Sequence, residues 1–288
     1  MYKIAILGCE NSHAKNFLDL IKLGEYPDIE VVGVYSEEIE ASQKLNDQFG
    51  VKIMSDYSEL VGQIDGLMIT ARHGSNHFKY AKAYLGDGIP MFVDKPITCS
   101  IDDAAEFMKL AKENNVRFCG GSTCQALKET LELAKCVREE QCGVLKGGSI
   151  VCPIQLESVY GGFFFYAQHL IDIMTTIFGE QVLKIRATQR DGSVTFDAYY
   201  ENYTVTGTYL EKIGYYGASV YGSKDHRHEK LIFTPQSFRH EMNDMHDLLS
   251  GEAMKKSYES FVLPVYIMNA IVRSIESGMI EEVERIIL

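Results

Sequence analysis

The first 120 residues alternate between short apolar segments and longer amphipathic ones. The apolar segments, most of them rich in β-branched residues, lie at 3–7, 29–35, 51–54, 66–70, 90–94 and 116–120. The segments between them place apolar residues at helical spacing, at 14–23, 38–49, 58–62, 76–85 and 101–114. This rhythm is typical of βαβ units, which build a parallel sheet covered by helices on both faces. We therefore expect an N-terminal α/β domain over residues 1–122.

The rhythm changes after residue 122. A helix over 127–140 and a strand over 144–153 precede a series of strand-like segments at 182–189, 193–200, 203–210 and 213–221. Tight polar turns separate these segments, which indicates an antiparallel sheet. Helices over 240–249 and 263–277 end the chain. The change of rhythm predicts a second α/β domain over 123–288, with a large, mostly antiparallel sheet.

Composition excludes several classes of function. The formal net charge of −12 argues against a nucleic-acid partner, which needs a basic face. The sequence contains no run of 18 apolar residues, so no membrane-spanning helix is expected. The first residues lack the pattern of a secretory signal. The seven cysteines form no C-x-x-C pair, so we expect a cytoplasmic protein without disulfides or a metal site. Metal binding by the histidines at 226, 228, 240 and 246 remains open, but a solvated polar stretch is favoured.

A glycine loop, Gly8-Cys-Glu-Asn-Ser-His13, joins the first predicted strand to the first helix. A doubly wound Rossmann sheet binds pyrophosphate here, on the free N–H groups of the helix N-terminus. Only the first glycine of G-x-G-x-x-G is present, and a carboxylate at the second position must turn away from phosphate. The candidate cofactor-binding residues are Gly8, Glu10, Asn11, Ser12 and His13. A plain strand–turn–helix junction is the alternative.

The end of the second strand, Tyr35-Ser-Glu-Glu38, bears on the choice of cofactor. Ser36 stands where an acid usually binds the ribose diol, and Glu37 follows it. No arginine lies close by to accept a 2′-phosphate, so the sequence favours NAD(H) over NADP(H). Glu38 is equally well explained as a solvated helix start.

Four motifs resemble one family. Phe92-Val-Asp-Lys-Pro96 resembles the E-K-P motif of the Gfo/Idh/MocA oxidoreductases, named after glucose–fructose oxidoreductase and inositol dehydrogenase. Residues 70–77 resemble the family's T-P-N-x-x-H turn, 161–172 its G-G…H-x-x-D segment, and 270–278 its terminal helix. The resemblance implies a Rossmann domain followed by a domain whose open sheet mediates homo-oligomerisation.

The same resemblance assigns roles to individual residues. It implies Lys95 and His169 as catalytic residues in hydride transfer to nicotinamide from an alcohol. An alcohol that loses a hydride must also lose a proton, so a base and a nearby cation suit the chemistry. The further cofactor contacts implied are Thr70, His77, Asp94, Lys95 and Pro96. The substrate contacts are Lys95, Ser122, Thr123, Tyr166, His169 and Asp172.

The chain departs from the family at Phe165, where members commonly carry an acid one helical turn before the histidine. Tyr160 or Tyr166 is the alternative source of a hydroxyl. Our leading hypothesis is an NAD(P)-dependent dehydrogenase or reductase for a small polyol, sugar or related metabolite. One alternative is a non-catalytic sensor that binds a dinucleotide. Another is a protein whose glycine loop binds a different ligand altogether.

Four tyrosines are predicted on an exposed face of the second sheet. Such a face serves as a subunit interface or as a substrate wall. The residues are Tyr199, Tyr203, Tyr209 and Tyr215.

Overall fold

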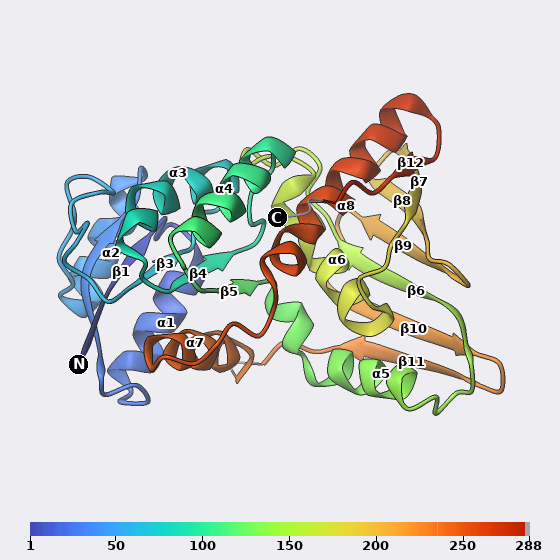
Figure 1. The fold of residues 1–288 in the computed structure, drawn as a ribbon, viewed down its shortest axis with the longest axis horizontal. Coiled ribbons are helices and arrows are strands. Elements are labelled where there is room, and N and C mark those ends of the chain that lie inside the picture. The colour runs from blue at the N-terminus through green and yellow to red at the C-terminus, as the bar shows by residue number, and fades with distance from the viewer. Residues whose placement is uncertain (235, 286–288) are drawn as a thin grey trace. The chain divides into compact units, whose positions relative to one another are not determined.

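The computed structural model describes residues 1–234 and 236–285, which divide into two compact units (Figure 1). The N-terminal unit contains Met1–Gly121 and Phe238–Phe261, and the C-terminal unit contains Ser122–Ser237 and residues 262–285. The sequence prediction placed everything after residue 122 in the second domain. The segment from Phe238 joins the first unit because Met242 and Met245 are buried in that unit's apolar core. Local sequence contains no signal for this return of the chain.

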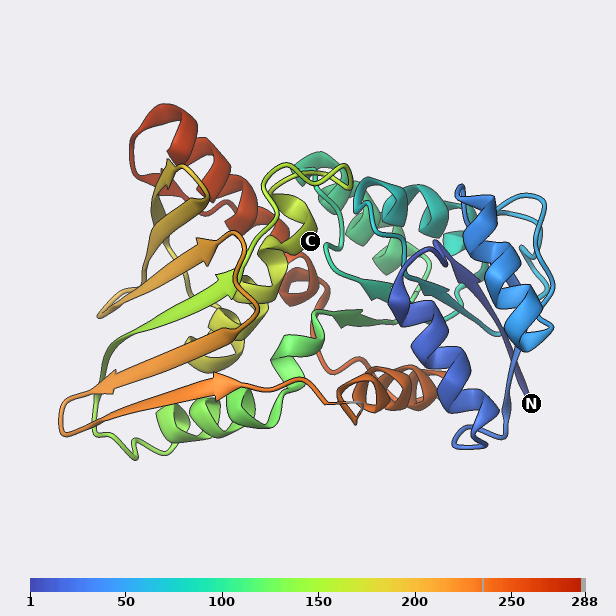
Figure 2. The same cartoon turned by 180° about the vertical axis from the view of Figure 1, so that it is seen from behind.

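The N-terminal unit is built on a parallel sheet, as predicted, although the sheet has five strands and not the six expected. In spatial order its strands are β2 (Ile29–Tyr35), β1 (Tyr2–Leu7), β3 (Gly66–Ile69), β4 (Met91–Asp94) and β5 (Phe118–Gly121). Its helices are α1 (Ser12–Lys22), α2 (Ile39–Phe49), α3 (Ser75–Tyr84), the 3-10 turn η1 (Leu85–Asp87), α4 (Ile101–Glu113) and α7 (Gln236–Leu249). Helices α3 and α4 cover one face of the sheet, and α1 and α7 lie together on the other (Figures 1 and 2). The carboxyl ends of the parallel strands therefore gather at one edge, where ligands of such sheets bind.

Two elements expected in this unit do not form. The predicted strand at 51–54 is reduced to a single bridge between Ile53 and Val34, beside edge strand β2. The predicted helix at 58–62 is a series of turns. Side chains compete for the backbone there, because Glu59 accepts hydrogen bonds from both the N–H and the hydroxyl of Ser55.

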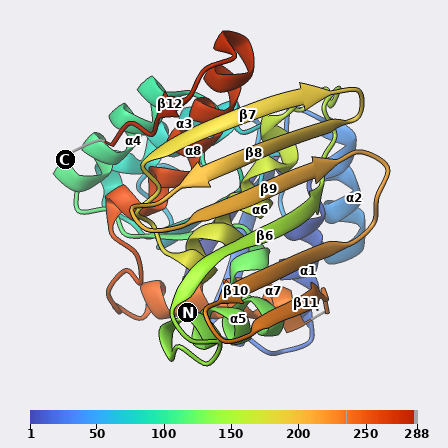
Figure 3. The ribbon, with the colours of Figure 1, turned by 90° about the vertical axis from the view of Figure 1, so that its right-hand side faces the viewer.

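The C-terminal unit contains a seven-stranded, mostly antiparallel sheet (Figure 3), which confirms the predicted fold class. In spatial order its strands are β11 (His226–Leu231), β10 (Tyr216–Gly222), β6 (Leu145–Pro153), β9 (Thr204–Leu210), β8 (Ser193–Tyr199), β7 (Lys184–Arg190) and β12 (Glu281–Glu282). One pair, β6 with β9, is parallel. The other elements are the 3-10 turn η2 (Thr123–Ala126), α5 (Lys128–Arg138), α6 (Phe164–Phe178) and α8 (Tyr258–Ser277), whose first turn is part of the N-terminal unit. No helix in the described part of the chain has the length and apolar character needed to cross a membrane.

One face of this sheet packs on helices and the other is open (Figure 3). The burial pattern alternates along β8 and β9, as expected for a sheet covered on one side. The prediction that Tyr209 belongs to the exposed face was wrong. Its side chain is fully buried on the helix side, and its hydroxyl donates to the carbonyl oxygen of Ala167 on α6 at 2.7 Å.

His226 and His228, for which a solvated polar stretch was favoured over metal binding, lie on strand β11. Its sequence is dominated by charged residues because it is an edge strand with one solvated face. Arg227 reaches across to Glu132 on α5 at 3.1 Å and also pairs with Glu229 at 2.8 Å.

Candidate functional site

The loop between β1 and α1 is shaped by Gly8. Its φ is +77°, and a Cβ atom added there would lie 2.3 Å from the Cα atom of Ala71. The carbonyl oxygen of Gly8 accepts a hydrogen bond from the hydroxyl of Thr70 at 3.0 Å, and its N–H donates to Tyr35 at 2.8 Å. The loop is thereby tied to the ends of β2 and β3. Only glycine fits at this position.

Glu10, at the second position of the glycine motif, turns its carboxylate toward the end of β2. Oε2 accepts a hydrogen bond from the hydroxyl of Ser36 at 2.6 Å, and Oε1 accepts one from the backbone N–H of Arg72 at 3.0 Å. The structure thus brings Glu10 together with Ser36. It does not bring Glu37 to this cluster, because Glu37 forms an exposed ion pair with Lys79 at 2.7 Å.

His13, at the third position of the motif, is buried between two carboxylates. Its Nδ1 lies 3.4 Å from Oδ2 of Asp94, and its Nε2 lies 3.6 Å from Oε2 of Glu241 on α7. Burial lowers the pKa of His13, although Asp94 acts in the opposite direction. Asn11 joins this cluster by donating from Nδ2 to Asp94 at 2.8 Å, while Ser12 stays exposed at the start of α1. Sequence reasoning missed Glu241, since no local signal linked α7 to the loop.

The end of β4 carries the segment that resembles E-K-P. Oδ1 of Asp94 accepts a hydrogen bond from the N–H of Lys95 at 2.7 Å, and both side chains are buried. His77 lies with Nδ1 2.6 Å from the carbonyl oxygen of Pro96 and Nε2 2.7 Å from that of Ala71. Its side chain is fully buried, and burial lowers the pKa of His77. His77 therefore acts by fixing two loops rather than by presenting its own ring.

In the C-terminal unit, α6 and the start of η2 form a second polar cluster. Nδ1 of His169 lies 2.6 Å from the hydroxyl oxygen of Ser122. Oδ2 of Asp172, one turn along α6, accepts from the N–H of Ser122 at 2.7 Å and from Gln168 at 3.1 Å. His169 is only 7% exposed. The structure thus holds together three of the predicted substrate contacts, Ser122, His169 and Asp172.

Cys124 was not predicted as a member of this cluster. Its N–H donates to the hydroxyl oxygen of Ser122 at 3.0 Å, and its Sγ lies 3.5 Å from Nδ1 of His169. The intervening residue, Thr123, is buried at the start of η2. Ser122 is the N-cap of η2, and that turn brings the cysteine back toward the histidine.

A pocket of about 640 Å³ in this unit adjoins the cluster. Tyr166 and Tyr216 line it, with their ring centroids 5.3 and 6.1 Å from that of His169. The polar side chains lining it are Gln155, Glu157, Ser158, Glu211 and Lys212. Its size and its many hydrogen-bonding groups suit a small polyhydroxylated ligand.

Phe165, which replaces the family acid, joins an aromatic group beside the pocket. Its ring centroid lies 5.4 Å from that of Tyr160 and 4.9 Å from that of Tyr166. Neither contact supplies a charge. These three rings therefore pack against one another beside the pocket.

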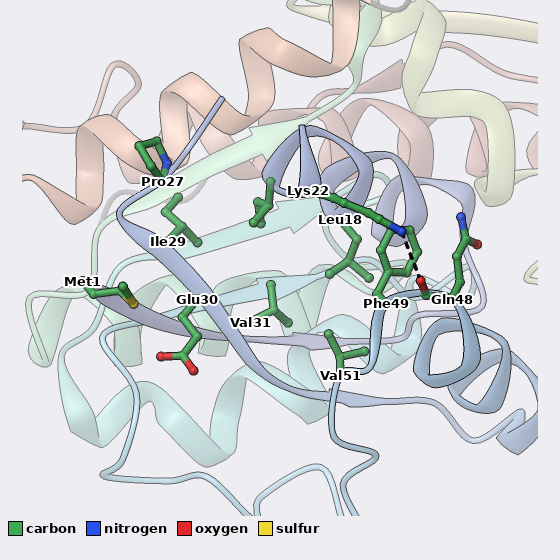
Figure 4. Close-up of a pocket in the computed structure, with 11 residues that line it drawn as sticks. Met1, Leu18, Lys22, Pro27, Ile29, Glu30, Val31, Gln48, Phe49 and Val51 are labelled. Carbon is green, nitrogen blue, oxygen red and sulfur yellow. Dashed lines mark hydrogen bonds between the residues drawn. The ribbon is translucent and has the colours of Figure 1, made fainter. Parts of the chain in front are cut away.

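A second pocket, of about 460 Å³, lies in the N-terminal unit between α1, β2 and the end of α2 (Figure 4). Leu18, Val31 and Phe49 line it, and Lys22 reaches toward the carbonyl oxygen of Gln48 at 3.4 Å (Figure 4). It contains none of the predicted site residues. Across residues 1–234 and 236–285, no group of three His, Cys, Asp or Glu side chains is arranged to hold a metal ion.

Comparison with known proteins places these clusters in context. Residues 2–122 match the model of the GFO_IDH_MocA oxidoreductase family, described as having an NAD-binding Rossmann fold. No curated protein matches the chain.

Solved structures share the fold along almost the whole chain. A myo-inositol 2-dehydrogenase from Lactobacillus plantarum is 14% identical, with a TM-score of 0.85 over 98% of this chain and 99% of its own. GenD2 from gentamicin A biosynthesis, solved with NAD, is 13% identical, with a TM-score of 0.86 over 98% and 96%. A putative NADPH-dependent oxidoreductase from Desulfitobacterium hafniense is 16% identical, with a TM-score of 0.83 over 98% and 97%.

Proposed function

We propose that this chain, whose residues 2–122 match the model of the Gfo/Idh/MocA oxidoreductase family, is an NAD(H)-dependent dehydrogenase or reductase of that family. Its substrate is a hydroxyl or keto group of a small polyol, sugar or related metabolite. The hydrogen bond between His169 and Ser122 beside a polar pocket carries this proposal. It supplies an oriented acid–base group where a hydroxylated ligand fits.

The N-terminal unit suits a dinucleotide. Gly8 lets the loop turn tightly against Ala71, where any side chain would clash, which is the role of the first glycine in a dinucleotide-binding turn. Glu10 supplies, from the loop, the carboxylate that Ser36 lacks at the end of β2. A carboxylate accepts the hydroxyls of a ribose and repels a 2′-phosphate, so the proposal includes a preference for NAD(H). The nicotinamide ring, when bound, accepts or donates the hydride.

His169 takes the proton of the substrate hydroxyl. With its proton on Nδ1, the ring donates to the hydroxyl oxygen of Ser122, and Nε2 keeps its lone pair as the base. The hydrogen bond from the N–H of Ser122 to Asp172 fixes the backbone of Ser122. It thereby also positions the Ser122 hydroxyl, which orients the histidine ring. Lys95 adds a cation that favours the alkoxide form of the substrate. This role rests on the match of Phe92–Pro96 to the family motif.

The substrate class follows from the pocket beside His169. Its lining offers carboxylates, hydroxyls and one ammonium group, which match neutral hydroxyl groups by accepting and donating hydrogen bonds. Among the structural neighbours, several are described as myo-inositol or scyllo-inositol dehydrogenases. We therefore place cyclic polyols first among the substrates to test.

A non-catalytic sensor is the competing function, and Phe165 is the observation that favours it. A sensor binds dinucleotide without oxidising any polyol. The experiment is a screen of inositols and sugars with NAD⁺, following NADH by absorbance, in the wild type and in His169→Ala. We expect turnover that the variant loses while calorimetry shows that it still binds NADH. Binding of NADH without turnover of any polyol or sugar would favour the sensor.

The proposal also includes self-association through the open face of the C-terminal sheet and a cytoplasmic location. The open face carries half-buried polar and aromatic side chains, among them Thr206, which donates to Asp197 at 2.7 Å, and Tyr199. All seven cysteines are free thiols, which suits a reducing compartment. Sedimentation velocity tests the first point directly.

A further inference from the structure

Two cysteines of the C-terminal unit bring their sulfur atoms into contact. The Sγ atoms of Cys136 and Cys142 lie 3.3 Å apart. Cys136 is in the last turn of α5, and Cys142 is in the loop that leads to β6. Neither takes part in the proposed oxidoreductase reaction. Formation of a disulfide requires the sulfurs to approach to about 2.05 Å, a movement of little more than an ångström.

The backbone holds this arrangement in place. Helix α5 ends in a Schellman turn, in which the N–H of Gln141 donates to the carbonyl oxygen of Cys136 at 3.0 Å and the N–H of Glu140 donates to Val137 at 3.1 Å. Glu140 has a φ of +50°, as the turn requires. The turn reverses the chain so that Cys142 returns over Cys136. The pairing is therefore a property of the folded helix end rather than of two mobile side chains.

The other side of Cys142 is anchored to the hairpin between β10 and β11. Its carbonyl oxygen accepts hydrogen bonds from the N–H groups of Lys224 at 3.0 Å and Asp225 at 3.3 Å. A Cβ atom added at Gly222 would lie 2.0 Å from that carbonyl oxygen, so the hairpin approaches closely. The backbone of Cys142 is thus held on one side by the turn after α5 and on the other by the β10–β11 hairpin.

Access to the pair is from the Cys142 side. Cys142 is 7% exposed and Cys136 only 1%, and the residues at 139–141 are exposed. A small oxidant therefore reaches Cys142 first. The hydrogen bond to Cys136, together with burial, raises the pKa of Cys142, so Cys142 is mainly a protonated thiol at neutral pH.

We propose that Cys136 and Cys142 form a reversible intrachain disulfide, with a peroxide as the oxidant. The thiol of Cys142 first loses its proton to solvent; the resulting thiolate attacks one peroxide oxygen, the O–O bond breaks, and Cys142 becomes a sulfenic acid. The sulfur of Cys136 then displaces water from that sulfenic acid to form the S–S bond. In total, two thiols lose two protons and two electrons, and hydrogen peroxide becomes two molecules of water. A dithiol reductant reverses the reaction.

Peptide mapping tests this directly, because trypsin cuts on both sides of each cysteine. Cleavage after Lys135, Arg138 and Lys146 releases Cys136 in peptide 136–138 and Cys142 in peptide 139–146. The folded protein is treated with hydrogen peroxide, alkylated and digested. We expect one species with the mass of both peptides less two hydrogen atoms, which dithiothreitol separates into the two.

Three variants sharpen the result. Cys136→Ser and Cys142→Ser each abolish the linked species, whereas Cys119→Ser, on β5 of the other unit, leaves it unchanged. Recovery of both wild-type peptides separately, with alkylated or over-oxidised cysteines, overturns the proposal. Linkage of either cysteine to a different partner overturns it as well.

Discussion

Nδ1 of His169 and the hydroxyl oxygen of Ser122 lie 2.6 Å apart, and the N–H of Ser122 is held in turn by Asp172 at 2.7 Å. The histidine on α6 is therefore oriented by the residue at the start of η2. This is the arrangement expected of an acid–base histidine whose second nitrogen faces a ligand. Ser122 thus orients the histidine in a chain that carries Phe165 where members of the Gfo/Idh/MocA family commonly carry an acid, but it supplies no charge.

Ser122→Ala removes the group that orients His169. We expect kcat to fall about tenfold with little change in KM, since positioned acid–base catalysis contributes about 10²–10⁴-fold and the ring itself remains. Ser122→Thr keeps a hydroxyl and serves as the conservative control. The pH–rate profile is the deciding measurement. Equal kcat values and superimposable profiles in wild type and Ser122→Ala contradict the orienting role.

Gly8→Ala tests the fit of the glycine loop. The added methyl group lies 2.3 Å from the backbone of Ala71 at a φ of +77°, so we expect about 3–5 kcal/mol lower stability. Gly50→Ala is the matched control, with a φ of +72° but open space around it. It should cost only about 1 kcal/mol. Urea unfolding followed by circular dichroism measures both, and equal losses would show that the steric argument fails.

The parallel sheet was predictable because each strand is a continuous apolar run between amphipathic helices. The same reasoning gave no separate strand at β11, because charged residues such as Arg227 form the outer strand of a hairpin at the sheet edge. It also failed for α7, because the burial of Met242 against the N-terminal unit is a long-range property. Periodicity records which face of an element is buried, but not against which partner.

The candidate site was predictable only in part. The resemblance pointed to Ser122, His169 and Asp172, which the structure holds together by hydrogen bonds. From the sequence we expected the carboxylate of Glu10 to turn away from phosphate. Its hydrogen bond with Ser36 could not be predicted, because it depends on the direction of the side chain in the folded loop. Glu241 was missed, because it lies on a helix far along the chain from the glycine loop and no sequence pattern connects the two.

Acid should destabilise the protein through His77 and His13. Burial lowers the pKa of both imidazoles below the ordinary value of about 6.5, so the unfolded chain binds more protons in the range just below that value. Stability is therefore present above about pH 6.5 and is lost as the pH falls through the lowered pKa values. Urea midpoints between pH 5 and 8 measure this. His77→Gln, which cannot titrate, should flatten the decline, and an unchanged slope argues against this source.

Glu10→Gln tests the proposed cofactor preference. The amide keeps the size of the side chain but loses the charge, and a charge-assisted hydrogen bond contributes about 1.5 kcal/mol, or about tenfold in affinity. We expect weaker binding of NADH and a smaller difference in affinity between NADH and NADPH. Glu37→Gln is the control, because Glu37 lies in an exposed ion pair outside the loop. Tighter binding of both dinucleotides by Glu10→Gln would mean that the carboxylate obstructs the site.

The central claim is that the N-terminal unit binds a nicotinamide dinucleotide. Calorimetric titration of the wild-type protein with NADH, and separately with NADPH, tests it most directly, since the chain has no tryptophan to report binding. The account predicts saturable binding of NADH that is tighter than that of NADPH. Absence of binding by either dinucleotide contradicts it, and would mean that Glu10 and His13 have converted the loop to another use.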